Sequence, residues 1–245
     1  MKPCGSKFFY SKEASVYDKE RWLSGVGQYI DQTQKEIVRA ILSDISGKKI
    51  LDTGAGTGRF SLSLAEMGGE VTALDISQEM LDVLKENAEK SHLSEKISTI
   101  QADASQKIPF PDETFDFCIA INTLSHIKDA RGLFKEVRRI LKPNGIFLSN
   151  YPNLISVYFP FGVLVNLRGR SLWKKVFTRW YSLHDIRSLY KTNKFSIETI
   201  KGQVHFSAKI NNRMILTVLQ FIDRLFRNSS LKYIAPTIFV KAIRK

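Results

Sequence analysis

The sequence contains little of what stabilises small secreted proteins or anchors membrane proteins. Of its 245 residues only two are cysteines, Cys4 and Cys118, so it holds neither a disulfide framework nor a cysteine-based metal cluster. The longest predominantly apolar stretch, residues 154–167, contains a proline and is too short to cross a bilayer. The first residues are polar, and no apolar signal-peptide core follows them. We therefore expect a cytoplasmic globular protein without a bound metal.

Acidic residues are scarce in the C-terminal part of the chain. Residues 145–245 hold 17 Lys and Arg against 3 Asp and Glu, whereas residues 1–144 hold 20 against 21, so the net charge of +13 comes entirely from the C-terminal part. A basic surface of this kind favours an anionic partner, which could be nucleic acid, phospholipid headgroups or an acidic substrate. The alternative is a solvated basic face that binds no partner.

Residues 49–60 form the most informative stretch. A short apolar run ends at Asp52, three glycines follow at alternate positions (Gly54, Gly56 and Gly58), and a helical pattern begins directly after them. Glycine allows a sharp backbone bend and a close ligand approach, and free N–H groups at a helix start can face that ligand. The stretch predicts a strand, a ligand-binding turn and a helix.

Two common nucleotide-binding motifs fit this stretch poorly. The dinucleotide fingerprint requires a glycine where Arg59 stands, and the Walker loop requires Gly-Lys-Ser/Thr where Gly58-Arg59-Phe60 stands.

Further carboxylates follow the next predicted strands. Asp75 ends the second strand 21 residues after Gly54, close to the spacing of a ribose-binding carboxylate in a βαβ unit. Asp103 follows a third strand at residues 97–101, and His126 comes soon after a fourth at residues 115–122. Each aspartate alone would also suit a strand end or a helix cap. Their conjunction with the glycines favours a nucleotide-type ligand.

In this order and spacing, the motifs resemble those of the class I S-adenosylmethionine-dependent methyltransferases, in particular the type 11 branch that acts on small molecules. The family's first motif, a carboxylate followed by three alternating glycines, is matched throughout residues 52–58. The resemblance implies S-adenosylmethionine as cofactor, with Asp75 on the ribose hydroxyls and Asp103 near the adenine amino group. The cofactor site that it implies comprises Tyr17, Asp52, Gly54, Ala55, Gly56, Gly58, Asp75, Ile76, Met80, Asp103, Ala104 and Asn122.

His126 is the candidate general base, because histidine is suited to take a proton near neutral pH. A structural histidine that bonds a loop carbonyl is the alternative. Tyr17, likewise, could touch the methionine part of the cofactor or simply pack in the core. His184, His205, Tyr151 and Tyr158 are weaker catalytic candidates.

The fold that the resemblance implies is a Rossmann-like, seven-stranded, mostly parallel sheet with helices on both faces. Its last strand is antiparallel, and insertions follow strands five and six. Alternating strand and helix patterns along the chain agree with this class. We expect a single domain over residues 1–245, with a helical cover at 1–44, a cofactor-binding core at 45–150 and a substrate side at 151–245.

Residues 152–181 interleave aromatic and basic residues and contain no acid. This composition suits peripheral contact with a membrane surface, a nucleic-acid surface, or a lid packed on the domain. Nucleic acid is not the favoured partner.

The acceptor class is narrowed by two missing features. The Asn/Asp-Pro-Pro-aromatic motif of amino-group methyltransferases that act on adenine or glutamine is absent, and no cysteine is a plausible nucleophile for pyrimidine methylation. The favoured function is methyl transfer to oxygen or activated carbon of a small-molecule or lipid-like acceptor. An RNA methyltransferase and a non-catalytic cofactor-binding module remain open, as do the acceptor's identity and the oligomeric state.

Overall fold

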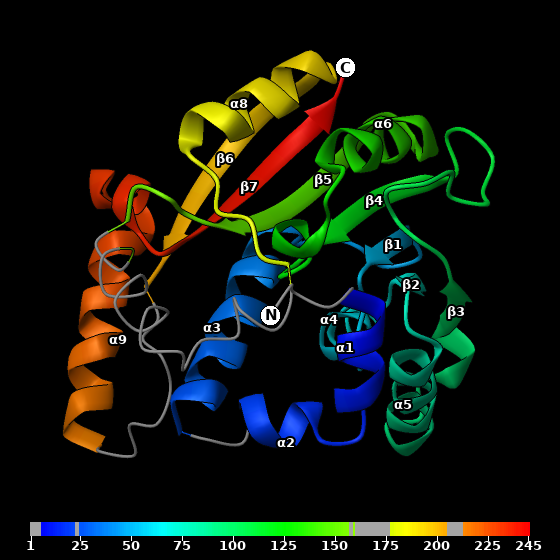
Figure 1. Ribbon diagram of the computed structural model, residues 1–245, viewed down its shortest axis with the longest axis horizontal. Coiled ribbons are helices and arrows are strands. Elements are labelled where there is room, and N and C mark those ends of the chain that lie inside the picture. The colour runs from blue at the N-terminus through cyan, green and yellow to red at the C-terminus, as the bar shows by residue number, and fades with distance from the viewer. Residues whose placement is uncertain (1–5, 23–24, 157–158, 160–176, 205–212) are drawn as a thin grey trace.

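The computed structural model describes residues 6–22, 25–156, 159, 177–204 and 213–245. Within them one sheet runs through the molecule in the order β3-β2-β1-β4-β5-β7-β6 (Figure 1). Its strands are β1 (Lys49–Thr53), β2 (Glu70–Asp75), β3 (Ile97–Gln101), β4 (Phe115–Ala120), β5 (Leu141–Pro152), β6 (Phe195–Gln203) and β7 (Thr237–Arg244).

Strand β7 is antiparallel to both of its neighbours, β5 and β6, while the strands from β3 to β5 pair in parallel. The carboxyl ends of β1, β2 and β4 therefore meet at one edge of the sheet. The expected Rossmann-like fold with an antiparallel last strand is confirmed.

Helices cover both faces of the sheet (Figure 1). Helices α6 and α8 pack on one face, and α3 and α4 pack on the other. None of the described helices is long and apolar enough to cross a membrane. The helices are α1 (Ser6–Glu13), α2 (Tyr17–Trp22), α3 (Gly25–Ile41), α4 (Arg59–Glu66), α5 (Gln78–Lys90), α6 (Ala130–Ile140), α8 (Leu183–Thr192) and α9 (Arg213–Asn228), with 3-10 turns η1 (Ser94–Lys96), η2 (Leu124–His126) and η4 (Ser230–Ile234).

Polar side chains cap the starts of α5, α6 and α8. The hydroxyl of Ser77 accepts a hydrogen bond from the amide of Met80 at the start of α5, and Asp129 accepts one from Gly132 at the start of α6. Ser182 and Asp185 form a reciprocal capping box at the start of α8.

Strand β5 begins earlier than the sequence predicts. The sequence Pro143-Asn144-Gly145 predicts a turn with a strand beginning at Ile146, but Leu141 already pairs with Phe115. The turn is accommodated as an irregularity within the strand, because Asn144 adopts a left-handed conformation with φ of 62°. The turn therefore interrupts the pairing of β4 with β5 without ending strand β5.

Candidate cofactor and methyl-transfer site

The loop between β1 and α4 is held against the end of β2. The amide of Gly54 donates to the carbonyl of Leu74 at 2.7 Å, and the amide of Gly56 donates to Oδ2 of Asp75 at 2.9 Å. Gly54, Gly56 and Gly58 all have positive φ, at 71°, 56° and 92°. This conformation is strained for other residues, which explains the alternating glycines.

The glycines do not all face the same surroundings. A Cβ on Gly58 would lie 2.7 Å from Cγ of Leu84 in α5, so Gly58 allows α5 to pack closely on the glycine loop. A Cβ on Gly56 would meet no protein atom within 4 Å. Gly56 therefore leaves space for a ligand, whereas Gly58 serves the packing of the fold.

Next to this loop lies a cavity of about 490 Å³. That volume is in the range of pockets that enclose a small-molecule ligand. The residues predicted for the site line this cavity, with the exception of Gly58. They are Tyr17, Asp52, Gly54, Ala55, Gly56, Asp75, Ile76, Met80, Asp103, Ala104, Asn122 and His126.

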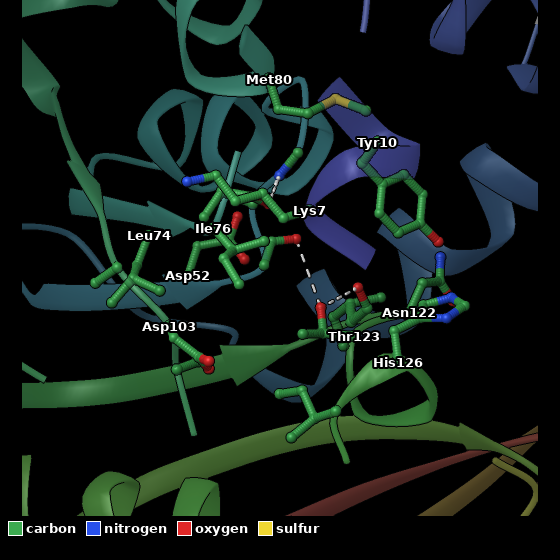
Figure 2. Close-up of a pocket in the computed structure, with 18 of the residues that line it drawn as sticks. Lys7, Tyr10, Asp52, Leu74, Ile76, Met80, Asp103, Asn122, Thr123 and His126 are labelled. Atoms are coloured by element: carbon green, nitrogen blue, oxygen red, sulfur yellow. Dashed lines mark hydrogen bonds between the residues drawn. The ribbon is translucent and has the colours of Figure 1, made fainter. Parts of the chain in front are cut away.

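The two ends of the cavity differ in chemistry. Leu74 and Asp103 lie at one end, and Tyr10 and His126 lie at the other (Figure 2). Asp103 is exposed, and its Oδ1 accepts hydrogen bonds from the amide and hydroxyl of Ser105. The polar, open end suits an adenine amino group, and the aromatic end is where a transferred group would lie.

Asp75 is buried between the glycine loop and the start of α5. Its Oδ1 accepts a hydrogen bond from the amide of Ser77 at 2.9 Å, while Oδ2 accepts from Gly56. Burial raises the pKa of this carboxyl, and the bonds from the two amides oppose that rise. Each oxygen keeps a further lone pair, so the carboxylate can accept from a ribose diol as well.

Asp52 is more deeply enclosed than its place in the motif suggests. Only 2% of the residue is exposed, and its Oδ2 accepts a hydrogen bond from the hydroxyl of Ser61 at 2.7 Å. Burial raises the pKa of Asp52 to about 7, although the bond from Ser61 opposes the rise. Asp52 thus joins β1 to α4 in addition to lining the cavity.

Helices α1 and α2 cover the cavity, and polar contacts hold both of them to the cofactor loops. The hydroxyl of Thr57 in the glycine loop donates to Oδ1 of Asp18 at 2.7 Å. Ser11 on α1 donates to Glu79 and contacts the hydroxyl of Ser77, both at the start of α5. The cover is therefore attached to the loops that follow β1 and β2.

Lys7 and Tyr10 of α1 also line the cavity. Sequence reasoning missed both residues. The ring centroid of Tyr10 lies 6.0 Å from that of Tyr17 and 5.6 Å from that of His126. Nothing in the short α1 segment marks these side chains, because only the packing of α1 on α5 directs them into the cavity.

His126 lies in η2 and is held by a contact with the backbone of Phe177. Its Nδ1 lies 2.9 Å from the carbonyl oxygen of Phe177. Because a carbonyl can only accept, Nδ1 carries the proton in this contact and Nε2 carries the lone pair. Burial, together with the nearby charge of Arg21, lowers the pKa of His126, and the bond to Phe177 opposes this. The imidazole is therefore neutral at pH 7 and can accept a proton.

A buried amide network fixes the end of β4. Asn122 has φ of 59°, and its backbone amide donates to Oδ1 of Asn150 at 2.6 Å. The side chain of Asn122 donates to Gln34 at 3.1 Å, and Gln34 donates in turn to Gln203 at 3.1 Å. Sequence reasoning missed Gln34, Asn150 and Gln203, since they come from three distant elements. The network holds the segment that carries His126.

The weaker catalytic candidates lie elsewhere. Tyr151 is buried in the core beside Tyr181, and His184 is exposed on α8. His205 and Tyr158 lie outside the described residues, as does most of the basic, aromatic stretch 152–181. Within the described part of the chain, no group of His, Cys, Asp and Glu side chains could hold a metal ion.

The known proteins that resemble this chain include methyltransferases. Residues 51–149 match a family model described as a methyltransferase domain. The sterol 24-C-methyltransferase ERG6B of Gibberella zeae is 39% identical over 102 residues, which cover 41% of this chain and 27% of that protein. The ubiquinone biosynthesis O-methyltransferase of Actinobacillus pleuropneumoniae is 32% identical over 115 residues, which cover 46% of this chain and 49% of that protein. The chain thus spans about half of these relatives' length or less.

The fold comparison covers nearly the whole chain. A crystal structure of a SAM-dependent methyltransferase from Thermotoga maritima has a TM-score of 0.71 over 97% of this chain and 99% of that one, at 16% identity. This likeness shows the fold, and the matched segment 51–149 contains the glycine loop and the ends of β2 and β4. Residues 51–149 therefore match a methyltransferase domain, and the chain as a whole has the fold of S-adenosylmethionine-dependent methyltransferases.

Proposed function

We propose that this protein transfers a methyl group from S-adenosylmethionine to an oxygen or activated carbon of a small, lipid-like acceptor. The observation that carries the proposal is the shared cavity of Asp75, the Gly56 amide and a neutral His126. Asp75 would bind the ribose of the cofactor, and His126 would take a proton from the acceptor.

The residues fit S-adenosylmethionine along the length of the cavity. Asp75 would accept from the ribose hydroxyls, Asp103 would lie near the adenine amino group, and Gly56 leaves space without a Cβ. Ile76 and Met80 would pack against the adenosine part, and Asn122 and Tyr17 against the methionine part.

Methyl transfer is an in-line displacement, so the protein mainly orients the acceptor and excludes water. The bound cofactor supplies an electrophilic methyl group on its sulfonium. On transfer, the methyl group would leave the sulfonium for the acceptor, and the acceptor would lose a proton. Nε2 of His126 would take that proton, while the bond from Nδ1 to the carbonyl of Phe177 keeps the ring oriented.

Two kinds of evidence support a lipid-like acceptor. The relatives include proteins named for a sterol and for ubiquinone biosynthesis, with carbon and oxygen as the methylated atoms. The aromatic end of the cavity, formed by Tyr10, Tyr17 and His126, suits an acceptor with an apolar body. We further propose that residues 1–245 act as one domain, cytoplasmic or peripheral at a membrane, with residues 1–44 as cover and 151–245 on the acceptor side.

The test is methyl transfer from cofactor labelled in its methyl group to an acceptor panel of lipid, aqueous and RNA fractions. We expect label in the lipid fraction that depends on Asp75 and survives ribonuclease treatment. Label that ribonuclease removes would show an RNA methyltransferase. Tight cofactor binding without transfer to any fraction would show a binding module instead.

A further inference from the structure

The outward side of α9 exposes an apolar stripe. Val218, Phe221 and Leu225 are 52%, 64% and 48% exposed, and their spacing of three and four residues places them on one side of the helix. Helices of globular proteins normally turn such a stripe toward the core. The stripe here faces away from the sheet that α9 packs on.

A buried carboxylate fixes α9 in this orientation. Asp223 is fully buried on the opposite side of the helix, where it accepts hydrogen bonds from the amide of Val204 at 2.7 Å and the hydroxyl of Tyr29 at 2.9 Å. Arg227 neutralises it at 2.6 Å. Rolling α9 to bury the stripe would break the bonds from Val204 and Tyr29 and leave these buried polar groups without their partner, which is costly. The exposed stripe is therefore built into the fold.

Neighbouring segments extend the exposed apolar area. Leu231 and Ile234 of η4 are 41% and 37% exposed and follow α9 after a bend in which Ser229 accepts from the amide of Leu231. Ile155 is 64% exposed beside η4, since the side chain of Asn153 donates both to its carbonyl and to that of Tyr233. We call Ile155, Val218, Phe221, Leu225, Leu231 and Ile234 the α9 surface.

Basic residues lie at the α9 surface. Residues 204–245 contain 8 Lys and Arg and a single acid, the buried Asp223, although Lys241 and Arg244 on β7 pair with Glu198 and Glu113. Arg224 is exposed between Phe221 and Leu225, and Lys232 lies beside Leu231. A partner with an apolar interior and an anionic surface would match both the exposed apolar side chains and the basic residues. Pairing with a second copy would bring like charges together.

We propose that the α9 surface docks this protein onto an anionic lipid bilayer. Exposed phenylalanine and leucine would enter the boundary between headgroups and acyl chains, and Arg224 and Lys232 would lie against the lipid phosphates. The site thus assigned shares Ile155 with the stretch 152–181, in which the sequence predicts membrane contact, and otherwise lies on α9 and η4.

The position of the α9 surface connects docking to the cavity. Helix α9 follows the carboxyl end of β6, and η4 leads into the first residue of β7, so both lie at the sheet edge that carries the cofactor loops (Figure 1). If the acceptor is lipid-like, as proposed above, docking brings this edge to the membrane that holds it. Docking itself does not depend on methyl transfer.

The test is co-sedimentation of the full chain with phosphatidylcholine vesicles that contain or lack phosphatidylglycerol. We expect binding to the anionic vesicles and about tenfold weaker binding without phosphatidylglycerol. Phe221→Ser combined with Leu225→Ser should weaken binding at least about tenfold, and Arg224→Glu about tenfold.

Matched variants separate docking from folding and general charge. Val16→Ser removes an exposed apolar side chain elsewhere, and Arg187→Glu makes the same charge change on α8. Both should bind vesicles like the unmodified protein, and all variants should keep the same Tm and calorimetric affinity for S-adenosylmethionine.

Unchanged vesicle binding in the Phe221, Leu225 or Arg224 variants would overturn the proposal. So would sedimentation equilibrium that shows a dimer lost with Phe221→Ser, because a second copy would then occupy the surface. Transfer to a detergent-dispersed acceptor is measured in parallel. Its absence would count against the proposed function and leave the docking result intact.

Discussion

The carboxylate of Asp75 accepts a hydrogen bond from the amide of Gly56 at 2.9 Å, which joins the end of β2 to the glycine loop after β1. The same carboxylate accepts from the amide of Ser77 at the start of α5. One side chain therefore holds two cofactor loops in place and still has lone pairs for a ribose.

The Asp75→Ala variant should lose most of its affinity for S-adenosylmethionine. Removal of a charged acceptor costs about 1.5–3 kcal/mol, or about ten- to hundredfold in Kd, and loosening of the Gly56 loop adds to the loss. Isothermal titration calorimetry measures the change directly. Asp82→Ala, which removes an exposed carboxylate from α5, should bind normally. An Asp75→Ala variant with unchanged affinity would disprove the proposed cofactor site.

His126→Gln should lower kcat and leave cofactor binding nearly unchanged. Glutamine can still donate to the carbonyl of Phe177 but cannot take a proton, so a loss of about 10²–10⁴-fold is expected for a base-assisted step. Because burial lowers the pKa of His126, activity of the unmodified enzyme should hold near neutral pH and fall as the pH drops through that lowered value. The variant should lack this acidic limb.

The control for His126 is His184→Gln on α8, an exposed histidine away from the cavity. This variant should keep both the kcat of the unmodified protein and the fall of activity at acidic pH. If His126→Gln retains the kcat of the unmodified protein, the imidazole has only a structural role.

Local sequence patterns determine much of this fold. The glycines after β1, the aspartate at the end of β2 and the caps Ser77 and Asp129 are short-range signals, because each satisfies a backbone need within a few residues. The antiparallel last strand was predicted from the resemblance to the family rather than from a local pattern. All of these features are present in the structure.

The remaining parts of the site depend on long-range packing. Gln34, Asn122 and Asn150 bond one another from α3 and the ends of β4 and β5, and no spacing in the sequence brings them together. Tyr10 reaches the cavity because Ser11 beside it is held at the start of α5. Asp52 matches the motif, yet its burial and its bond to Ser61 appear only once α4 is packed on β1.

Asp52 should make the ligand-free protein less stable as the pH rises. Its folded-state pKa of about 7 lies above its ordinary value of 3.8, so between those values the folded state binds a proton that the unfolded state releases. The contribution of Asp52 to the free energy of unfolding is therefore present at low pH and is lost as the pH rises through about 7. Urea unfolding from about pH 5 to pH 8 should show a flatter pH dependence for Asp52→Asn than for the unmodified protein.

A second aspartate provides the matched control. Burial would raise the pKa of Asp116, but the bonds from Lys142 and from the amide of Lys49 outweigh it and lower that pKa. The stability that Asp116 contributes is lost only in acid, below the tested range. Asp116→Asn should therefore lower stability without altering the pH dependence. If the stability of Asp52→Asn changed with pH as steeply as that of the unmodified protein, the raised pKa of Asp52 would be contradicted.

Gly56 and Gly58 should respond differently to the same substitution. Both have positive φ, so alanine costs about 1–2 kcal/mol of backbone strain at either position. At Gly58 the added Cβ would also lie 2.7 Å from Leu84, and overpacking of this kind adds about 1–3 kcal/mol. At Gly56 it would meet no protein atom and would occupy space at the cavity beside Asp75. Gly58→Ala should therefore lose more stability in urea unfolding.

Gly56→Ala, in contrast, should lose more cofactor affinity relative to its loss of stability. Calorimetry on both folded variants separates the two effects, because Gly58 does not line the cavity. Equal losses of affinity would mean that Gly56 acts through the shape of the loop alone. The opposite order, with Gly58→Ala binding more weakly than Gly56→Ala, would place the ligand on the α5 side of the loop, where Leu84 packs.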